Sequence, residues 1–304
     1  LFKRILRIIG IGKEKKEEAI KPIKTDTSEK QSVKVKEPAS EKVKENRKPS
    51  NPNRKTQVKA EKPSPAWDIS QYKVEEAEGK KRFHDFDLPL NIMHAISDNG
   101  YKYCTPIQAE LLTDTLNGKD AFGQAQTGTG KTAAFLITIL TNILKKRAPE
   151  KPKPGTPRAL ILAPTRELVI QIAKEASALS KYSKIKIISV YGGMHYKKQK
   201  SLLETEQFDV VVATPGRLLD FCKTKVIHLN RVEILVLDEA DRMLDMGFIP
   251  DVREIIKKTP QRGTRQTLFF SATISDRVKR LAHSWTNNPS FVTIDPEQVT
   301  VDLV

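Results

Sequence analysis

Three carboxylates follow directly on an apolar run in the stretch EILVLDEAD. Residues 234–237 are all apolar, and Asp238, Glu239 and Asp241 come immediately after them. Burying carboxylates is costly unless a cation meets them. At the end of a buried strand, Asp238 would hold Mg²⁺ through its hydration shell, because this ion keeps its waters and takes few carboxylates. Glu239 would then orient or deprotonate an attacking water, whereas a simple acidic helix cap accounts for one acid but not for two.

A glycine-rich loop would bind the phosphate anion that such a metal ion accompanies. In AQTGTGKT, residues 125–132, Gly128 and Gly130 allow a tight turn whose N–H groups, with the following helix start, make a phosphate cradle. Lys131 would reach the β- and γ-phosphates and the Thr132 hydroxyl would ligate Mg²⁺. Ala125 replaces the first glycine of GxxxxGK[ST], so a plain flexible turn is the alternative. The predicted nucleotide-binding residues here are Gln126, Thr127, Gly128, Thr129, Gly130, Lys131 and Thr132. Metal, phosphates and base are together the parts that nucleotide hydrolysis needs.

The elements that must position these groups alternate between strand-length apolar runs and segments of helical period. Strands are predicted at 121–125, 159–163, 185–191, 209–213, 234–237, 266–270 and 291–294, and helices at 131–146, 166–179, 197–203, 216–223, 241–246, 251–258 and 276–284. Continuous apolar strands alternating with helices indicate a mainly parallel sheet covered on both faces, a three-layer α/β/α sandwich. In such folds the loops at the carboxyl ends of the strands form the site.

The composition divides the chain into a tail and a folded part. The 304 residues carry a formal net charge of +16, which favours a polyanionic partner. Residues 13–80 are rich in Lys, Glu and Pro, so we expect a disordered linker there and the folded domain over residues 81–304. The two cysteines, Cys104 and Cys222, form no CxxC pair and favour a reducing compartment, and the five histidines show no zinc-ligand spacing.

The first residues, LFKRILRIIGIGK, resemble a signal peptide only superficially. Lys3, Arg4 and Arg7 interrupt the apolar run, which is also too short to cross a bilayer. A short basic amphipathic helix is predicted over residues 1–12, suited to weak membrane or partner contact through residues 1–9. A terminus without function is the alternative. For the linker, added RNA affinity and a solubilising spacer are equally compatible with its mixed Lys/Glu pattern.

A set of seven motifs in order resembles the DEAD-box RNA helicases over residues 83–304. The family's own motif I begins with Ala, as here, and the segment from Phe83 to Gln108 is most similar to the bacterial RhlB-type helicases of the RNA degradosome. The matching stretches are GYKYCTPIQ at 100–108, AQTGTGKT at 125–132, PTRELV at 164–169, the doublet at 192–193, TPGR at 214–217, LDEADRMLDMGF at 237–248 and SAT at 271–273.

The resemblance implies a RecA-like P-loop NTPase lobe in a cytoplasmic, ATP-dependent RNA helicase that unwinds short duplexes, with a role in RNA degradation beside a degradosome-type endonuclease. It implies that Gln108 reads the adenine and that Phe83 stacks on it, although a core position for Phe83 is the alternative. Asp241, Ser271 and Thr273 would couple hydrolysis to strand separation. The implied RNA-backbone contacts are Pro164, Thr165, Arg166, Gly192, Gly193, Thr214, Pro215, Gly216 and Arg217.

The sequence departs from the family pattern in one respect. The family's second lobe carries an HRIGR-type segment whose arginines act on the γ-phosphate, and no such segment occurs here. An arginine finger is worth about 10³–10⁵ in rate, so we expect an N-terminal fragment with weak or no hydrolysis by itself. A non-hydrolysing ATP/RNA-binding module or scaffold is the alternative. A DNA helicase or another RecA-like motor is disfavoured by the 100–108 and 237–248 stretches.

Overall fold

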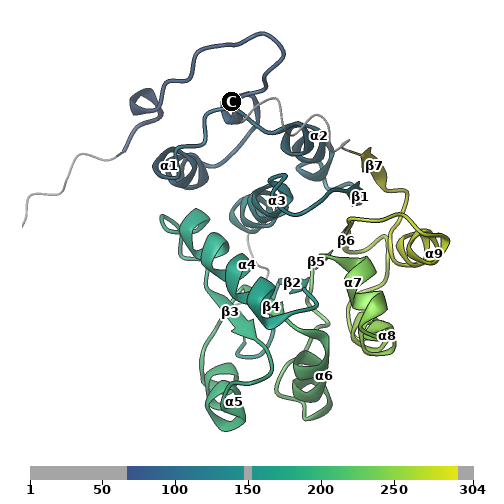
Figure 1. The fold of residues 1–304 in the computed structure, drawn as a ribbon. Helices are drawn as coiled ribbons and strands as arrows, with labels where there is room; N and C mark the ends of the chain where they lie inside the picture. Colours follow the sequence, from purple (N-terminus) through teal and green to yellow (C-terminus); the bar gives the residue numbers. More distant parts are fainter. Residues whose placement is uncertain (1–66, 147–152, 294–304) are drawn as a thin grey trace, which may run out of the picture. The chain divides into compact units, whose positions relative to one another are not determined.

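A seven-stranded, wholly parallel sheet with helices on both faces organises the chain in the computed structural model, which describes residues 67–146 and 153–293 (Figure 1). The predicted helix at 1–12 and residues 13–66 of the predicted linker lie outside the described residues. Among the described residues, no helix has the length and apolar character that crossing a bilayer requires. The predicted three-layer α/β/α architecture is confirmed.

The strands run in the order β3-β4-β2-β5-β6-β1-β7, and every pair is parallel. The inner strands β2, β4, β5 and β6 are buried along their whole length, as continuous runs of Val, Ile, Leu and Phe predict. Each strand lies within two residues of its predicted bounds. The strands are β1 (Ala121–Gln124), β2 (Ala159–Leu162), β3 (Ile187–Val190), β4 (Val210–Ala213), β5 (Ile234–Leu237), β6 (Gln266–Ser271) and β7 (Ser290–Thr293).

Helices cover both faces of the sheet, and two of them were not predicted from periodicity. Helices α1 and α2 precede the first strand, and α2 begins with a capping box in which Thr105 and Gln108 bind each other's backbone. The first and last residues of the other seven helices lie within two residues of the predicted bounds. The α-helices are α1 (Leu90–Asp98), α2 (Pro106–Thr115), α3 (Lys131–Lys145), α4 (Arg166–Leu179), α5 (Tyr196–Thr205), α6 (Pro215–Lys223), α7 (Ala240–Asp245), α8 (Ile249–Ile256) and α9 (Asp276–Trp285), with 3₁₀ turns η1 (Ile69–Gln71) and η2 (Phe83–Asp85).

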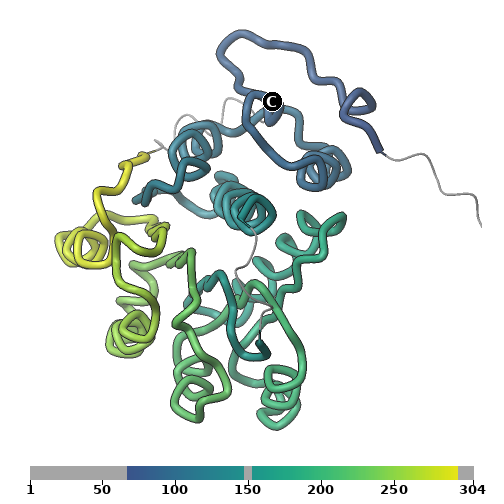
Figure 2. The backbone as a smooth tube through the Cα atoms, turned by 180° about the vertical axis from the view of Figure 1, so that it is seen from behind, coloured from purple at the N-terminus to yellow at the C-terminus, as the bar shows by residue number. Residues whose placement is uncertain are grey.

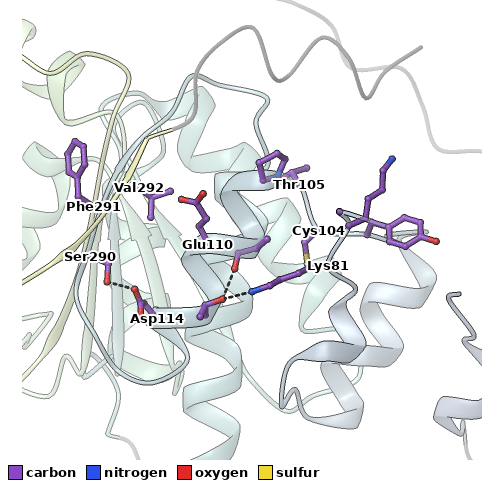
Figure 3. A pocket seen from close by; sticks show the side chains of 14 residues that line it. Lys81, Cys104, Thr105, Glu110, Asp114, Ser290, Phe291 and Val292 are labelled. Atoms are coloured by element: carbon purple, nitrogen blue, oxygen red, sulfur yellow. Dashed lines mark hydrogen bonds between the residues drawn. The ribbon is translucent and has the colours of Figure 1, made fainter. Parts of the chain in front are cut away.

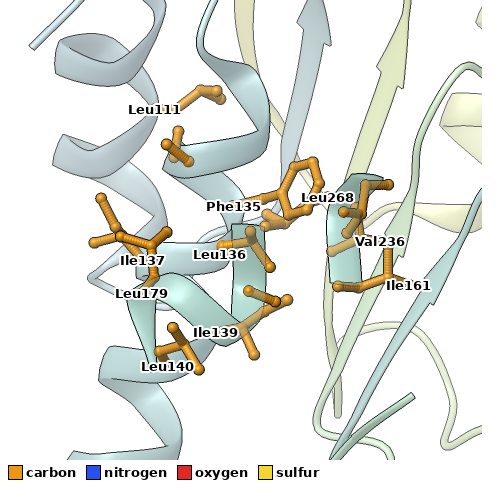
Figure 4. Close-up of a cluster of buried hydrophobic side chains, with 14 of the residues drawn as sticks. Leu111, Phe135, Leu136, Ile137, Ile139, Leu140, Ile161, Leu179, Val236 and Leu268 are labelled. Atoms are coloured by element: carbon orange, nitrogen blue, oxygen red, sulfur yellow. The ribbon is translucent and has the colours of Figure 1, made fainter. Parts of the chain in front are cut away.

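Each face of the sheet has its own hydrophobic core. Successive strand residues alternate between the two, because side chains of a strand point to opposite faces. One core joins the sheet to α1–α4, and the other joins it to α5–α9. Figure 2 shows the backbone of the two helix groups from behind. Figure 4 shows the first core, where Phe135, Leu136 and Ile139 of α3 lie beside Ile161 of β2 and Leu268 of β6. Helix α3, which begins at the glycine-rich loop, is thereby fixed against the sheet's centre.

The segment at 67–80 packs against the domain, so the predicted linker boundary at residue 80 is wrong. The Trp67 ring stacks on His94 of α1 with centroids 4.5 Å apart, and His94 stacks on Tyr182 at 3.5 Å. Ile69 and Val74 pack against the core on the same face. The apolar side chains that close this segment onto α1 are spaced too irregularly to produce a periodic signal in a Lys- and Glu-rich context.

Replacing Trp67 by Ala should lower the free energy of unfolding by about 1–3 kcal/mol, because both ring burial and stacking on His94 are lost. Urea denaturation followed by circular dichroism measures the change. Ile170→Ala on the outside of α4, where the side chain is 41% exposed, is the control and should shift stability by less than about 0.5 kcal/mol. An unchanged midpoint for Trp67→Ala would show that this segment does not belong to the cooperative unit.

Candidate functional site

The strand order brings the predicted site residues to one edge of the sheet in two neighbouring groups. Strands β5, β6 and β1 are adjacent, and they end at Asp238, Ser271 and the glycine-rich loop. Strands β3, β4 and β2 are also adjacent, and they lead into Gly192–Gly193, Thr214 and Pro164. The two groups meet where β2 pairs with β5. The predicted nucleotide residues and the predicted RNA-backbone residues therefore occupy separate halves of one edge.

The glycine-rich loop has the backbone geometry that its sequence predicts. Gly128 and Gly130 both have φ of 90°, and Gly130 is the left-handed N-cap of α3. A Cβ at Gly130 would also lie 2.5 Å from Gln108 Nε2, so this position needs glycine for close approach as well. Ala125 N donates to Ser271 O at 3.1 Å, which ties the start of the loop to the end of β6.

A buried ion pair connects this loop to the acidic strand end. Lys131 Nζ lies 2.9 Å from Asp238 Oδ1, and the two side chains are only 4% and 0% exposed. Burial raises the pKa of the Asp238 carboxyl, and the Lys131 ammonium opposes that shift. In this structure, the cation that meets the buried Asp238 carboxylate is thus Lys131.

The second oxygen of Asp238 fits the predicted metal role. Asp238 Oδ2 is buried and receives no hydrogen bond from the described residues, while Oδ1 accepts from Glu239 N at 3.0 Å. Thr132, in the first turn of α3, is half-buried and can offer its hydroxyl. The described residues contain no cluster of three or more His, Cys, Asp or Glu side chains that could hold a metal. A hydroxyl and one carboxylate oxygen are donors that suit Mg²⁺, an ion that keeps most of its waters and needs few protein ligands.

Glu239 adopts an unusual backbone conformation beside this pair. Its φ of 53° is left-handed, which costs free energy for a residue with a Cβ and marks a position held by its surroundings. The side chain is 11% exposed, and Oε2 accepts from Arg242 Nη1 at 3.2 Å. Arg242 thus fixes the carboxylate that was predicted to activate water.

The side chains of Gln108 and Phe83 both contact other residues of this chain. Gln108 Oε1 accepts from Thr105 N at 2.9 Å and Nε2 donates to Gly130 O at 3.1 Å, while Thr105 Oγ1 donates to Thr129 O. The Gln108 amide therefore holds the glycine-rich loop directly. Phe83 is fully buried, with its ring 6.2 Å from Tyr101, so stacking on an adenine is not compatible with its place in this structure. Its 3₁₀ turn places the ring in the hydrophobic core to which α1 and α2 also contribute, which is the alternative that the sequence left open.

A groove of about 770 Å³ runs beside α2 from the 103–106 segment to β7 (Figure 3). Thr105 and Cys104 lie at one end, and Ser290, Phe291 and Val292 of β7 lie at the other. Thr105 lines this groove and also bonds to Thr129 of the glycine-rich loop. Burial raises the pKa of the Cys104 thiol to about 12, so this cysteine is an unreactive lining residue.

The half of the edge formed by β3, β4 and β2 carries the predicted RNA-backbone residues. Helices α4 and α6 begin there, with Thr165 and Thr214 as N-caps, and the exposed Gly192–Gly193 follows β3 at the same edge. Helix N-termini and glycine N–H groups are suited to phosphate oxygens. Pro164, Pro215 and Gly216 shape these two helix starts.

Two arginines in this half are held by aromatic rings. The Arg166 guanidinium lies 5.3 Å from the Tyr191 ring centroid, and that of Arg217 lies 5.5 Å from Tyr196. Arg217 Nη1 also donates to Gln199 Oε1 at 3.0 Å, and buried Gln199 donates to Tyr191 O. Both guanidinium groups are therefore positioned rather than loose surface charges.

The predicted coupling residues lie in contact. The backbone N and the hydroxyl of Thr273 both donate to Asp241 Oδ2 at 2.9 Å, and Ser271 Oγ donates to Thr273 O. Partial burial acts to raise the pKa of Asp241, but these bonds and those from the backbone of Arg242 and Ala272 outweigh it and hold the pKa below its usual value. The loop after β6 is thus fastened to α7.

Sequence reasoning missed three residues that shape the site: Thr105, Gln199 and Arg242. The T-x-x-Q spacing of Thr105 and Gln108 is a capping-box signal and could have been read. Arg242 is three residues after Glu239, the spacing of helix neighbours. Gln199 gave no local signal, because its partners are Tyr191, which follows β3, and Arg217 of α6.

Comparisons with known proteins agree with this geometry. The family model described as DEAD/DEAH box helicase matches residues 105–281. Proteins called ATP-dependent RNA helicase RhlB from Pseudomonas aeruginosa (strain UCBPP-PA14) and Pseudomonas putida are 59% and 58% identical over 231 residues, covering 76% of this chain and 58% of each relative. One of the same name from Xanthomonas oryzae pv. oryzae is 49% identical over 223 residues, covering 73% and 39%. The chain thus spans at most about 58% of the length of these curated relatives.

Replacing Lys131 by Met should destabilise the fold by about 3–5 kcal/mol near neutral pH, because Asp238 is left buried without its cation. Burial then holds the Asp238 pKa above its usual 3.8 in the folded state, so the penalty is small below pH 3.8, grows as pH rises toward the raised pKa, and is full above it. Urea unfolding at pH 5 and pH 8 measures this. The double variant Lys131→Met/Asp238→Leu should recover most of the loss, and wild-type stability of the single variant at pH 8 would refute the argument.

Proposed function

The chain belongs to the DEAD/DEAH box helicase family, and we propose that it serves an ATP-dependent RNA helicase, coupling ATP binding and hydrolysis to the local unwinding of RNA duplexes. The observation that carries the proposal is the buried Lys131–Asp238 pair between the glycine-rich loop and the acidic strand end. A phosphate–Mg²⁺ complex brings an anion for Lys131 and a cation for Asp238, so it can replace this pair without leaving either charge unmatched.

The residues around the pair would divide the work of hydrolysis. The N–H groups of residues 126–132 and Lys131 would bind the phosphates, the Thr132 hydroxyl would ligate Mg²⁺, and Asp238 would hold the ion through its hydration shell. When bound, Mg²⁺ neutralises charge that develops on the phosphate oxygens. Glu239 orients the attacking water and accepts its proton, after its carboxylate is released from Arg242.

The other half of the edge would hold RNA. Gly192, Gly193 and the starts of α4 and α6 offer N–H donors, and Arg166 and Arg217 add fixed positive charge. Such contacts position a strand by its phosphates and do not read its sequence. The Asp241–Thr273 contact would link this strand to the state of the nucleotide, since it joins the loops that follow β5 and β6.

The finer part of the proposal concerns the cellular setting. We propose a cytoplasmic role in RNA degradation beside a degradosome-type endonuclease, supported by the resemblance to RhlB-type helicases and by two cysteines that are both unpaired. Membrane or partner contact through residues 1–9 belongs to the same proposal and falls outside the described residues. A non-hydrolysing ATP/RNA-binding module is the second candidate, favoured by the ion pair that Arg242 makes with Glu239.

We expect the 304-residue chain to bind ATP·Mg²⁺ but to hydrolyse it about 10³–10⁵-fold more slowly than a helicase that supplies arginine fingers. Glu239→Gln should lower any remaining turnover about 10²–10⁴-fold and leave ATP affinity unchanged, because it removes only the base. Phosphate release with and without single-stranded RNA, beside binding of a fluorescent ATP analogue, measures both. The hydrolysis proposal fails if Glu239→Gln turns over as fast as wild type, and absence of ATP binding would refute the whole proposal.

Replacing Gln108 by Ala should weaken binding of ATP and of inorganic triphosphate alike, because its amide supports Gly130 and caps α2. A loss of about 1–2 kcal/mol, or roughly five- to thirtyfold in affinity, is expected from two hydrogen bonds. Calorimetric titration of both ligands measures it. The exposed Gln171 on α4, replaced by Ala, serves as control. If only ATP binding fell, Gln108 would act through the adenine and not through the loop.

A further inference from the structure

A basic cavity lies at the opposite edge of the sheet from the site described above. Its volume is about 870 Å³, and it is bounded by the chain before β2, the end of α6 with its following loop, and the turn after α8. These segments stand at the amino ends of β2 and β5, whereas the nucleotide and RNA residues follow the carboxyl ends. The two sites are therefore on separate edges of the sheet.

The charge of this cavity is of one sign. Among the described residues that line it there is no Asp or Glu, and Thr156 and Asn230 add neutral hydrogen-bonding groups. One of the lysines, Lys223, also reaches Glu254 on α8 at 3.8 Å. The charged lining residues are Lys153, Lys223, Lys225, Arg231 and Lys258. Lys223 and Arg231 have partners of their own, so the charge offered to an entering anion is mainly that of Lys153, Lys225 and Lys258.

The base of the cavity is a fixed structure and not a loose loop. His228 N donates to Gly155 O at 2.8 Å, which joins the two lining segments. A Cβ at Gly155 would lie 2.3 Å from Val226 O, so the two backbones are in direct contact there. Ile227 and Leu229 are 2% exposed and anchor the loop in the core. The lysines are thus presented from a preorganised surface.

Lys225 is a charged lining residue whose backbone adopts the left-handed conformation, which is strained for a residue with a Cβ. It follows the C-cap of α6 with φ of 59°, and its N–H donates to Cys222 O at 3.1 Å. This is the position after a helix where glycine is favoured, because a Cβ is strained in the left-handed region. A lysine therefore lines the cavity at a position where glycine would be less strained.

We propose that this cavity is a second RNA site, which binds the sugar–phosphate backbone of single-stranded RNA at the edge of the sheet away from the nucleotide. The inference rests on the proposed function for its ligand class. Among the described residues that line the cavity there is no Phe, Tyr or Trp to anchor a peptide, and the lining offers ammonium, guanidinium, imidazole, hydroxyl and amide groups suited to phosphates. Phosphate recognition therefore fits it better than an acidic protein does.

The test is a salt titration of RNA binding by the full 304-residue chain. The variant Lys153→Gln/Lys225→Gly/Lys258→Gln removes three cations and relieves the strain at residue 225. Losing three phosphate contacts should reduce the slope of log K against log salt by about 2, so wild type loses about twentyfold more affinity than the variant between 50 and 200 mM KCl. An oligouridylate measured by fluorescence anisotropy, without nucleotide, is the probe. An unchanged slope overturns the proposal, and so does failure of the wild-type chain to bind this RNA.

Matched controls separate the cavity from general charge loss and from misfolding. Lys279→Gln, on exposed α9, removes a cation elsewhere and should leave the slope within about 0.7, the value for one contact. The thermal midpoint of the triple variant should equal or exceed that of wild type, because Lys225→Gly relieves strain. Acetylation of Lys153, Lys225 and Lys258 by an amine-reactive ester should fall when RNA is bound, while that of Lys279 stays constant. Equal protection of all four lysines would overturn a defined site.

Two further outcomes distinguish this inference from its competitors. If polyglutamate, and not oligouridylate, protects the three lysines, the ligand is an acidic protein and the proposal is wrong. ATP binding by the triple variant should equal that of wild type, because the cavity is on the other edge. Loss of ATP binding by the wild-type chain would refute the proposed function alone, whereas an unchanged RNA salt slope refutes only the second RNA site.

Discussion

The buried ion pair of Lys131 and Asp238 is the interaction on which the site depends. Neither charge could be buried alone, since each would bear the full cost of lost hydration. Together they join the start of α3 to the end of β5, across the strand β6 that lies between β5 and β1. The site therefore forms only if the strands pair in the observed order. Each member of the Lys131–Asp238 pair can exchange its partner for a bound ion, Lys131 for an anion and Asp238 for a cation.

The strand order gives this centre its surroundings. Because β5, β6 and β1 are neighbours, Asp238, the Asp241–Thr273 contact and the glycine-rich loop form one hydrogen-bonded unit, with Ala125 bound to Ser271. The β3-β4-β2 group forms a second unit through Arg217, Gln199 and the end of β3. The β2–β5 pairing joins the two units, and the bond from Asp238 N to Leu162 O continues it at this edge of the sheet. A shift of Asp238 would therefore act on the β3-β4-β2 half through the β2–β5 pairing.

How far sequence predicts this molecule depends on the range of the interactions involved. Strands such as 234–237 were predicted because continuous apolar runs are a local signal, and the glycine-rich loop because its φ values demand particular residues. The roles of Gln108 and Phe83 were not obtained from local pattern, since each is decided by a partner brought in from another element. The packing of Trp67 on His94 was missed for the same reason.

The stack at Trp67 also has an optical consequence. The chain has two tryptophans, and they belong to different layers: Trp67 packs with the α1–α4 core, while Trp285 lies in the α5–α9 core, its ring 6.2 Å from Phe269. Their emission reports on the two faces of the sheet separately. Single-tryptophan versions of the chain would therefore reveal whether both layers melt in one cooperative step or one loosens first.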